Sequence, residues 1–122
     1  MEGKEYRDFY QLPIWREGYE LLMLIYNISE KFPDWEKYAL SSQIIRSANS
    51  IIANIAEAHG RFSFNDKIRV LYIARGELAE TRSHLAVALG RKYINDVKFK
   101  NINIRYCDLA KKINLYINSL KQ

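Results

Sequence analysis

Three side chains in this sequence have the chemistry of a nucleophile, a general base or a soft metal ligand: His59, His84 and Cys107. Each lies in a different predicted helix, and no motif links any of them to a partner that would activate it. The sequence also lacks an HExxH pair, a Glu-x-x-His di-metal pair, a phosphate-binding glycine loop and a serine elbow. His59, beside Gly60 at a helix end, is expected to contact the terminal carbonyl groups. We therefore predict no enzyme activity, cofactor, metal site or small-molecule substrate.

Basic side chains form the second group whose chemistry indicates a ligand, because ammonium and guanidinium groups pair with phosphate. The chain has 19 Lys and Arg against 14 Asp and Glu, a net charge of +5 and an isoelectric point near 9.3. The candidate phosphate contacts cluster in its second half: Lys67, Arg69, Arg91, Lys92, Lys98, Lys100, Arg105, Lys111, Lys112 and Lys121. No helix-turn-helix, zinc-finger or RNP signature is present, so contact with RNA or DNA is predicted to lack sequence specificity. The alternative is an ordinary solvated, lysine-rich surface.

A polar stripe follows one side of the predicted helix 36–59, opposite its apolar face. Its members fall within a narrow arc at 100° per residue: Gln43, Arg46, Ser47, Ser50, Asn54, Glu57 and Arg61. Such a stripe could line a seam between subunits, with Asn54 and Glu57 fixing the register. The alternative is the solvated face of an amphipathic helix, on which Glu57 and Arg61 pair at i,i+4 for only tenths of a kcal/mol.

Two arginines, Arg75 and Arg82, fall within the apolar side of the predicted helix 64–91. Burying an unpaired guanidinium costs several kcal/mol, so each needs a carboxylate or the edge of the solvent. Glu57, Glu77 and Glu80 are the candidate partners, within one chain or between subunits. The alternative is that both side chains extend to water at the rim of the fold.

Long helices are the elements that must position these groups. Only 5 Gly and 2 Pro occur in 122 residues, too few turn signals for a β-sandwich of this size. Apolar residues recur at helical spacing in four segments: 13–31, 36–59, 64–91 and 96–121. Residues 1–11 are predicted to form a flexible arm. Helices of this length joined by short connections pack antiparallel to their neighbours. The prediction is an all-α, up-down-up-down antiparallel four-helix bundle over residues 12–122.

Local signals mark where these helices begin and end. Pro13 fits a first helical turn, and Gly60 stands where a left-handed C-terminal cap is expected. Ser63, followed by an aspartate three residues later, resembles a capping box, and Asn95 or Asp96 is the candidate cap of the last helix.

Apolar residues also occur outside the core stripes. The helix 13–31 is apolar around most of its circumference, and Val70, Ile73 and Val87 lie off the main stripe of helix 64–91. A helix that is apolar on more than one side usually contacts something besides its own bundle, so we predict a homo-oligomer. The alternative is scattered apolar groups covered by neighbouring aliphatic stems.

Three features of the sequence predict the cellular setting. A single cysteine excludes an intrachain disulfide, the N-terminal residues form no signal peptide, and no apolar run is long enough to span a bilayer. A reducing cytoplasmic setting with no membrane partner is the expectation.

The stretch SANSIIANIAEAHGR, residues 47–61, resembles the signature S-I-x-x-N-I-A-E-G-x-G-R of a specific family. That family consists of four-helix-bundle proteins encoded in intervening sequences of bacterial 23S ribosomal RNA genes. The resemblance runs from about residue 12 to residue 95. Further residues that match the family pattern lie in order on both sides of residues 47–61: Leu12-Pro13-Ile14-Trp15, Ile25-Tyr26, Phe32-Pro33, Leu40 with Gln43, and Ala74-Arg75-Gly76 with Glu80. The sequence departs from the family pattern at Ile45, Ala58, Glu77 and Thr81.

The resemblance implies a small helical bundle that forms ring-shaped homo-oligomers, typically pentamers, with no established enzymatic activity. The chain is more distantly similar to accessory proteins of diversity-generating retroelements, which are basic pentameric bundles that engage a reverse transcriptase and nucleic acid. The leading hypothesis is a non-enzymatic, homo-oligomeric adaptor that binds RNA or DNA through its basic surface. The alternative is a protein–protein assembly module, with the arm and helix 13–31 as contacts and no nucleic-acid role.

Overall fold

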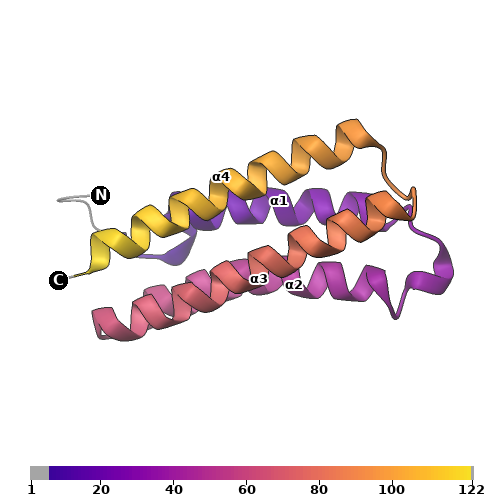
Figure 1. The fold of residues 1–122 in the computed structure, drawn as a ribbon. Coiled ribbons are helices and arrows are strands. Elements are labelled where there is room, and N and C mark those ends of the chain that lie inside the picture. The colour runs from indigo at the N-terminus through magenta and orange to yellow at the C-terminus, as the bar shows by residue number, and fades with distance from the viewer. Residues whose placement is uncertain (1–5, 122) are drawn as a thin grey trace.

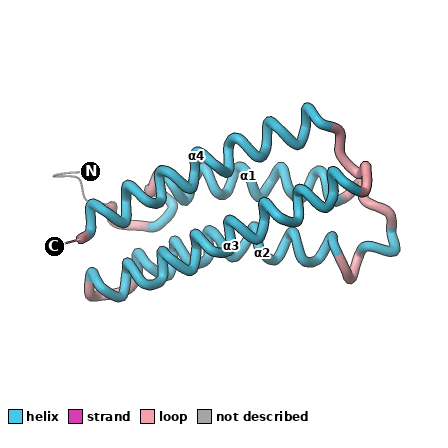
Figure 2. The backbone as a smooth tube through the Cα atoms, viewed as in Figure 1, coloured by secondary structure: helices cyan, strands magenta, loops and turns pink. Residues whose placement is uncertain are grey.

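The computed structural model describes residues 6–121, and every regular element within them is helical (Figures 1 and 2). Four α-helices are present: α1 Pro13–Ser29, α2 Leu40–Gly60, α3 Phe64–Gly90 and α4 Asp96–Leu120. Two short 3-10 helices, η1 Phe9–Gln11 and η2 Asp34–Glu36, precede α1 and α2 respectively. The predicted all-α class with four helices is confirmed.

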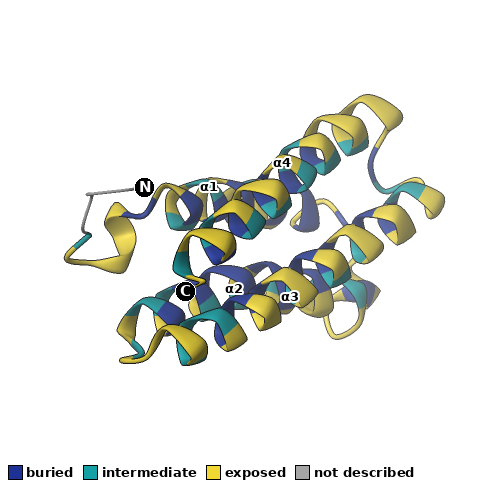
Figure 3. Cartoon of the chain, turned by 60° about the vertical axis from the view of Figure 1, so that its left-hand side comes forward, coloured by how far each residue is buried: buried dark blue, intermediate teal, exposed yellow. Residues whose placement is uncertain are grey.

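Each α-helix packs against its neighbours in sequence, and α4 also packs against α1. The contact between α2 and α3 is the most extensive of these. Figure 1 shows the α1–α2 and α3–α4 connections at one end of the molecule and the α2–α3 connection at the other. In Figure 3 every α-helix has a buried side and an exposed side. The largest fully buried residues include Leu21, Ile25, Ile44, Ile51, Ile55, Leu71, Leu78, Leu85, Leu109 and Tyr106.

The buried arc of α3 is broader than its main apolar stripe. Val70 was expected off that stripe, yet it is buried in the core, whereas Ile73 and Val87 are exposed. The reason is that α3 packs against both α2 and α4, so a residue to one side of the stripe still meets a neighbouring helix. The surplus apolar surface predicted for α3 is therefore reduced to Ile73 and Val87.

Polar caps begin α3 and α4 as predicted. The Ser63 hydroxyl accepts a hydrogen bond from the Asp66 N–H at 3.1 Å, and Asn95 Oδ1 accepts from the Lys98 N–H at 2.8 Å. Pro13 is the first residue of α1, where its missing N–H costs nothing.

The predicted left-handed cap at Gly60 is wrong. Gly60 is the last residue of α2, and its φ lies outside the left-handed region. The Lys67 ammonium group instead donates to the carbonyl oxygens of His59 at 2.9 Å and Ala58 at 3.4 Å. A charged donor from the next helix therefore satisfies the carbonyl groups that a turn was expected to satisfy.

The left-handed residue of this fold lies after α3, at Lys92, whose φ is 65°. The Tyr93 N–H donates to the Ala88 carbonyl and the Lys92 N–H to the Leu89 carbonyl, each at 2.9 Å. This pair of bonds is the Schellman pattern, which here places a lysine where glycine is usual.

Helix α2 begins at Leu40, four residues after the predicted start. The Glu36 carboxylate, which is buried, accepts hydrogen bonds from the Leu40 N–H at 3.1 Å and from the Tyr93 hydroxyl at 2.8 Å. Glu36 therefore caps the helix from outside it, and residues 34–36 form η2 instead of the first turn of α2. Likewise α1 ends at Ser29, two residues before the predicted end.

The described part of the predicted flexible arm, residues 6–11, is folded against the bundle, and residues 1–5 lie outside the described chain. Helix η1 packs against α1 and α2, and Leu12 after it is buried in the core. The His59 ring contacts the Arg7 carbonyl oxygen through Nε2 at 3.2 Å. His59 was expected to contact the terminal carbonyl groups of its own helix, but its ring contacts the arm instead.

Two positions in the core are under special constraint. A Cβ placed on Gly18 of α1 would lie 2.5 Å from the Ile52 Cγ2 atom of α2, so these helices approach closely because Gly18 has no side chain. Tyr106 of α4 is fully buried, and its hydroxyl has no hydrogen-bond partner within the described chain.

Candidate functional site

The three side chains with catalytic potential lie on three different helices and have different partners. His59 on α2 contacts the arm, His84 on α3 contacts Glu80 at 3.2 Å, and Cys107 on α4 is partly buried with a free thiol. Within residues 6–121 no group of three or more His, Cys, Asp and Glu side chains has the arrangement of a metal site.

A network of charged and polar groups joins α2 to α3 around Arg46. Its guanidinium donates to Glu77 at 3.4 Å, to Glu80, and to Gln43 at 3.2 Å. Glu80 also contacts His84, so one carboxylate lies between a guanidinium and an imidazole. The i,i+4 spacing of Glu80 and His84 is the signal in the sequence that could have indicated this pair.

The environment of His84 predicts how stability depends on pH. Burial lowers its pKa below the ordinary 6.5, Arg46 lowers it further, and Glu77 opposes them. The folded protein therefore binds this proton less readily than the unfolded chain does, and the unfolded chain gains it as the pH falls through about 6.5. We expect the contribution of His84 to the free energy of unfolding to be complete above this pH and to be lost progressively below it.

Urea unfolding of the protein and of a His84→Gln variant at about pH 7.5 and pH 5.5 measures this effect. The protein should lose more stability than the variant on acidification, and an NMR titration should place the His84 midpoint below 6.5. A midpoint above 6.5 would mean that Glu80 dominates the site and would contradict the prediction.

The residues of the predicted polar stripe of α2 lie in different environments, some buried and some exposed. Ser47 is fully buried and accepts a hydrogen bond at 2.8 Å from Thr81 of α3, which is also fully buried. The Asn54 amide bonds within α2 to Ser50, at 2.8 Å to its carbonyl and 3.1 Å to its hydroxyl. Glu57 and Arg61 form the predicted i,i+4 pair, and both are substantially exposed. One part of the stripe therefore faces α3, and its C-terminal part faces solvent.

The two arginines of α3 reach α4 through amides and not through carboxylates. Arg75 Nη1 donates to Asn114 Oδ1 at 2.7 Å, and Arg82 Nε donates to Asn103 Oδ1 at 2.8 Å. The Arg75 guanidinium also lies over the Tyr72 ring, 4.7 Å from its centroid. Both arginines are exposed residues, so the guanidinium groups remain at the edge of the solvent.

Four of the candidate phosphate-binding cations have partners within the chain. Lys67 caps α2, and burial lowers its pKa. Arg105 bonds to Glu17 at 3.1 and 3.2 Å and to Glu20 at 3.2 Å, which joins α4 to α1. Arg69 lies 3.6 Å from Asp66, and Lys112 lies 3.0 Å from Asp108.

The other candidates form no ion pair with a carboxylate anywhere in residues 6–121: Arg91, Lys92, Lys98, Lys100, Lys111 and Lys121. Arg91 lies among aromatic rings, 5.7 Å from the centroid of Trp35 and 5.8 Å from that of Tyr93. Sequence reasoning missed this Trp35 cluster, which consists of Phe32, Trp35, Arg91 and Tyr93, because its members come from two connections far apart in the chain.

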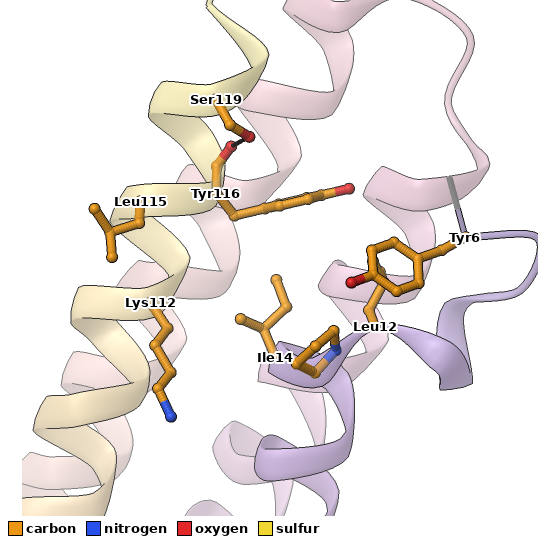
Figure 4. Close-up of a pocket in the computed structure, with 8 residues that line it drawn as sticks. Tyr6, Leu12, Ile14, Lys112, Leu115, Tyr116 and Ser119 are labelled. Atoms are coloured by element: carbon orange, nitrogen blue, oxygen red, sulfur yellow. Dashed lines mark hydrogen bonds between the residues drawn. The ribbon is translucent and has the colours of Figure 1, made fainter. Parts of the chain in front are cut away.

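An apolar pocket of about 280 Å³ opens between the start of α1 and the end of α4 (Figure 4). Leu12, Ile14 and Tyr116 line it together with Tyr6 of the arm. Lys112 is the one charged side chain among the described residues of its lining, and its ammonium group pairs with Asp108. The described lining of this pocket is therefore mainly apolar.

None of the helices that the structure describes combines the length and apolar character needed to cross a bilayer.

Comparison with known proteins identifies the family. Residues 10–115 match the family described as 23S rRNA-intervening sequence protein. A solved structure of a protein of unknown function from the S23 ribosomal protein family of Bacteroides thetaiotaomicron has 30% sequence identity and a TM-score of 0.79, covering 85% of this chain and 97% of that one. No curated protein matches. This chain belongs to the family of 23S rRNA-intervening sequence proteins.

Proposed function

We propose that this protein is a non-enzymatic cytoplasmic adaptor, an up-down-up-down bundle that self-associates into a ring and binds RNA or DNA without sequence specificity. The observation that carries the nucleic-acid part is the set of cations left without a carboxylate partner within residues 6–121. Five of them lie on the α3–α4 connection and along α4: Arg91, Lys92, Lys98, Lys100 and Lys111. Such a field attracts phosphate without reading base edges, and ring assembly would multiply it.

Self-association is supported by an apolar ridge along α1. The α1 ridge consists of Trp15, Tyr19, Met23 and Tyr26, which share one side of the helix, and the last three are exposed. The Trp15 and Tyr19 rings stack at 5.4 Å, so the ridge is an ordered surface. Apolar patches of this kind are typical of protein–protein interfaces. A ring of five is the size that the family resemblance implies.

The nucleic-acid part is tested by fluorescence anisotropy with structured RNA and with duplex DNA at about 50 and 200 mM salt. If all five cations neutralise phosphates of a duplex, affinity should fall by roughly two to three orders of magnitude between these conditions. No binding at the lower salt concentration would contradict this part of the proposal.

The assembly part is tested by sedimentation velocity on the protein and on a Met23→Glu variant at micromolar concentration. The variant should dissociate, because a carboxylate buried in an apolar interface costs several kcal/mol. An Asn118→Glu variant, which adds the same charge at an exposed position of α4, should stay associated. A monomeric parent protein would contradict the proposal.

The second candidate function is a protein–protein assembly module without a nucleic-acid role. The α1 ridge favours it, because Phe9 and Tyr10 of the folded arm extend its aromatic surface. Association that persists without any salt-dependent nucleic-acid affinity would select this alternative.

A further inference from the structure

The α1–α2 and α3–α4 connections lie at the same end of the bundle (Figure 1). An exposed aromatic ring of the α1–α2 connection, Trp35, is contacted there by residues of the α3–α4 connection. Trp35 of η2 is 66% exposed. The Tyr93 ring meets it edge-on, at 6.5 Å and 74°, and the Arg91 guanidinium lies 5.7 Å from its centroid. A large exposed ring that is positioned by its neighbours loses little conformational entropy when a planar ligand stacks on it.

Beside this ring lies a hollow with two unpaired cations, which we call the Lys31–Lys98 hollow. It measures about 200 Å³ and is lined by Asn27, Ile28, Lys31, Tyr93, Ile94, Asn95 and Lys98. Neither lysine has a hydrogen-bond or ion-pair partner for its ammonium group within the described chain. Tyr93 belongs both to this lining and to the Trp35 cluster, so the ring and the cations are neighbours.

The described lining of the Lys31–Lys98 hollow contains no carboxylate. Glu36 is buried and accepts hydrogen bonds from the Leu40 N–H and the Tyr93 hydroxyl. The other acidic residues at this end line neighbouring hollows: Glu30, Asp34 and Asp96.

We propose that this end of the bundle binds an unpaired segment of nucleic acid, with one base stacked on Trp35 and adjacent phosphates at Lys31 and Lys98. This inference rests on the proposed function and adds the class of partner to it. Inside a duplex both faces of a base are already stacked on its neighbours, so single strands should be preferred over duplexes. Every base presents a π-face, so the site should tolerate any sequence.

The test measures fluorescence anisotropy of a labelled single strand of about eight nucleotides, and of a duplex of the same length, at about 50 mM salt. Trp35→Ala should weaken single-strand binding by roughly 5- to 150-fold, whereas Trp35→Phe, which keeps an aromatic face, should retain most of the affinity. Phe62→Ala is the matched control, because Phe62 is fully exposed at the opposite end and should not contribute. Circular dichroism checks that each variant is folded.

A second pair of variants tests the phosphate contacts. Lys31→Gln combined with Lys98→Gln should reduce the slope of log affinity against log salt by about 1.4 for a single strand. Arg7→Gln combined with Arg16→Gln, which removes the same charge from the arm and the first turn of α1, should leave this short strand's slope unchanged.

The outcomes separate the two proposals. Salt-dependent binding that Trp35→Ala does not weaken, or equal affinity for the duplex, overturns the stacking site and leaves the proposed function in place. An unchanged slope in the Lys31→Gln, Lys98→Gln variant overturns the phosphate contacts. Failure of the parent protein to bind either nucleic acid overturns both proposals.

Discussion

Gly18→Ala should lower the free energy of unfolding by about 1–3 kcal/mol, although alanine is the better helix former. The added Cβ would lie 2.5 Å from Ile52 Cγ2 and 3.7 Å from Leu109 Cδ2. The Ile52 methyl group sits on a β-branched carbon whose rotamer is restricted in a helix, so it cannot simply turn away. Relief therefore requires α1 and α2 to move apart, which disturbs the core on both sides. Urea unfolding measures the change.

A double-mutant cycle shows whether this contact is the cause. In an Ile52→Ala background the clash is removed, and Gly18→Ala should then be neutral or raise stability by up to about 1 kcal/mol. Gly76→Ala is the matched control, because no atom lies within 4 Å of a Cβ placed there. It should raise stability by about 1 kcal/mol. A stabilising Gly18→Ala in the parent protein would show that the helices separate easily and would contradict the prediction.

Tyr106→Ala should lower the free energy of unfolding by about 3–5 kcal/mol, since it leaves a cavity in the core. Tyr106→Phe should do the opposite and raise it by about 1 kcal/mol. The hydroxyl is buried without a partner within residues 6–121, so its removal abolishes a desolvation cost and breaks no hydrogen bond. The same burial raises the pKa of the phenol well above its ordinary value.

Tyr93→Phe is the matched control for Tyr106→Phe, because it makes the same chemical change at a satisfied hydroxyl. The Tyr93 hydroxyl donates to the buried Glu36 carboxylate at 2.8 Å. Its loss should lower stability by about 1.5–3 kcal/mol, the range for hydrogen bonds to charged groups. If both substitutions destabilise the protein equally, the Tyr106 hydroxyl forms a hydrogen bond in solution, and the prediction fails.

Features encoded by neighbouring residues could be predicted from the sequence. The four helices follow from apolar spacing, and the caps at Ser63 and Asn95 follow from side chains that bond a few residues along the chain. The Glu57–Arg61 pair is local in the same sense. These interactions depend on helical geometry alone, so tertiary packing does not alter them.

Features that depend on tertiary neighbours could not be predicted. Lys67 acts on the end of the preceding helix, and the start of α2 is set by Glu36, which is held by Tyr93 from a distant connection. Arg105 was a candidate phosphate contact, yet it faces two glutamates of α1. Which cations remain unpaired depends on how the helices are arranged, and a count of charges contains no such information. The Trp35 cluster was missed for the same reason.

Both described ends of the chain lie at the end of the molecule opposite the α1–α2 connection (Figure 1), and this connection contains Trp35. An affinity tag, a fluorophore or a surface tether attached at either terminus is therefore carried away from the proposed stacking site. Immobilised through a terminus on a sensor chip, the protein would present the Trp35 cluster to the flowing solution without obstruction from the support. A label near Trp35 would instead be displaced by, or compete with, the strand whose binding it is meant to report.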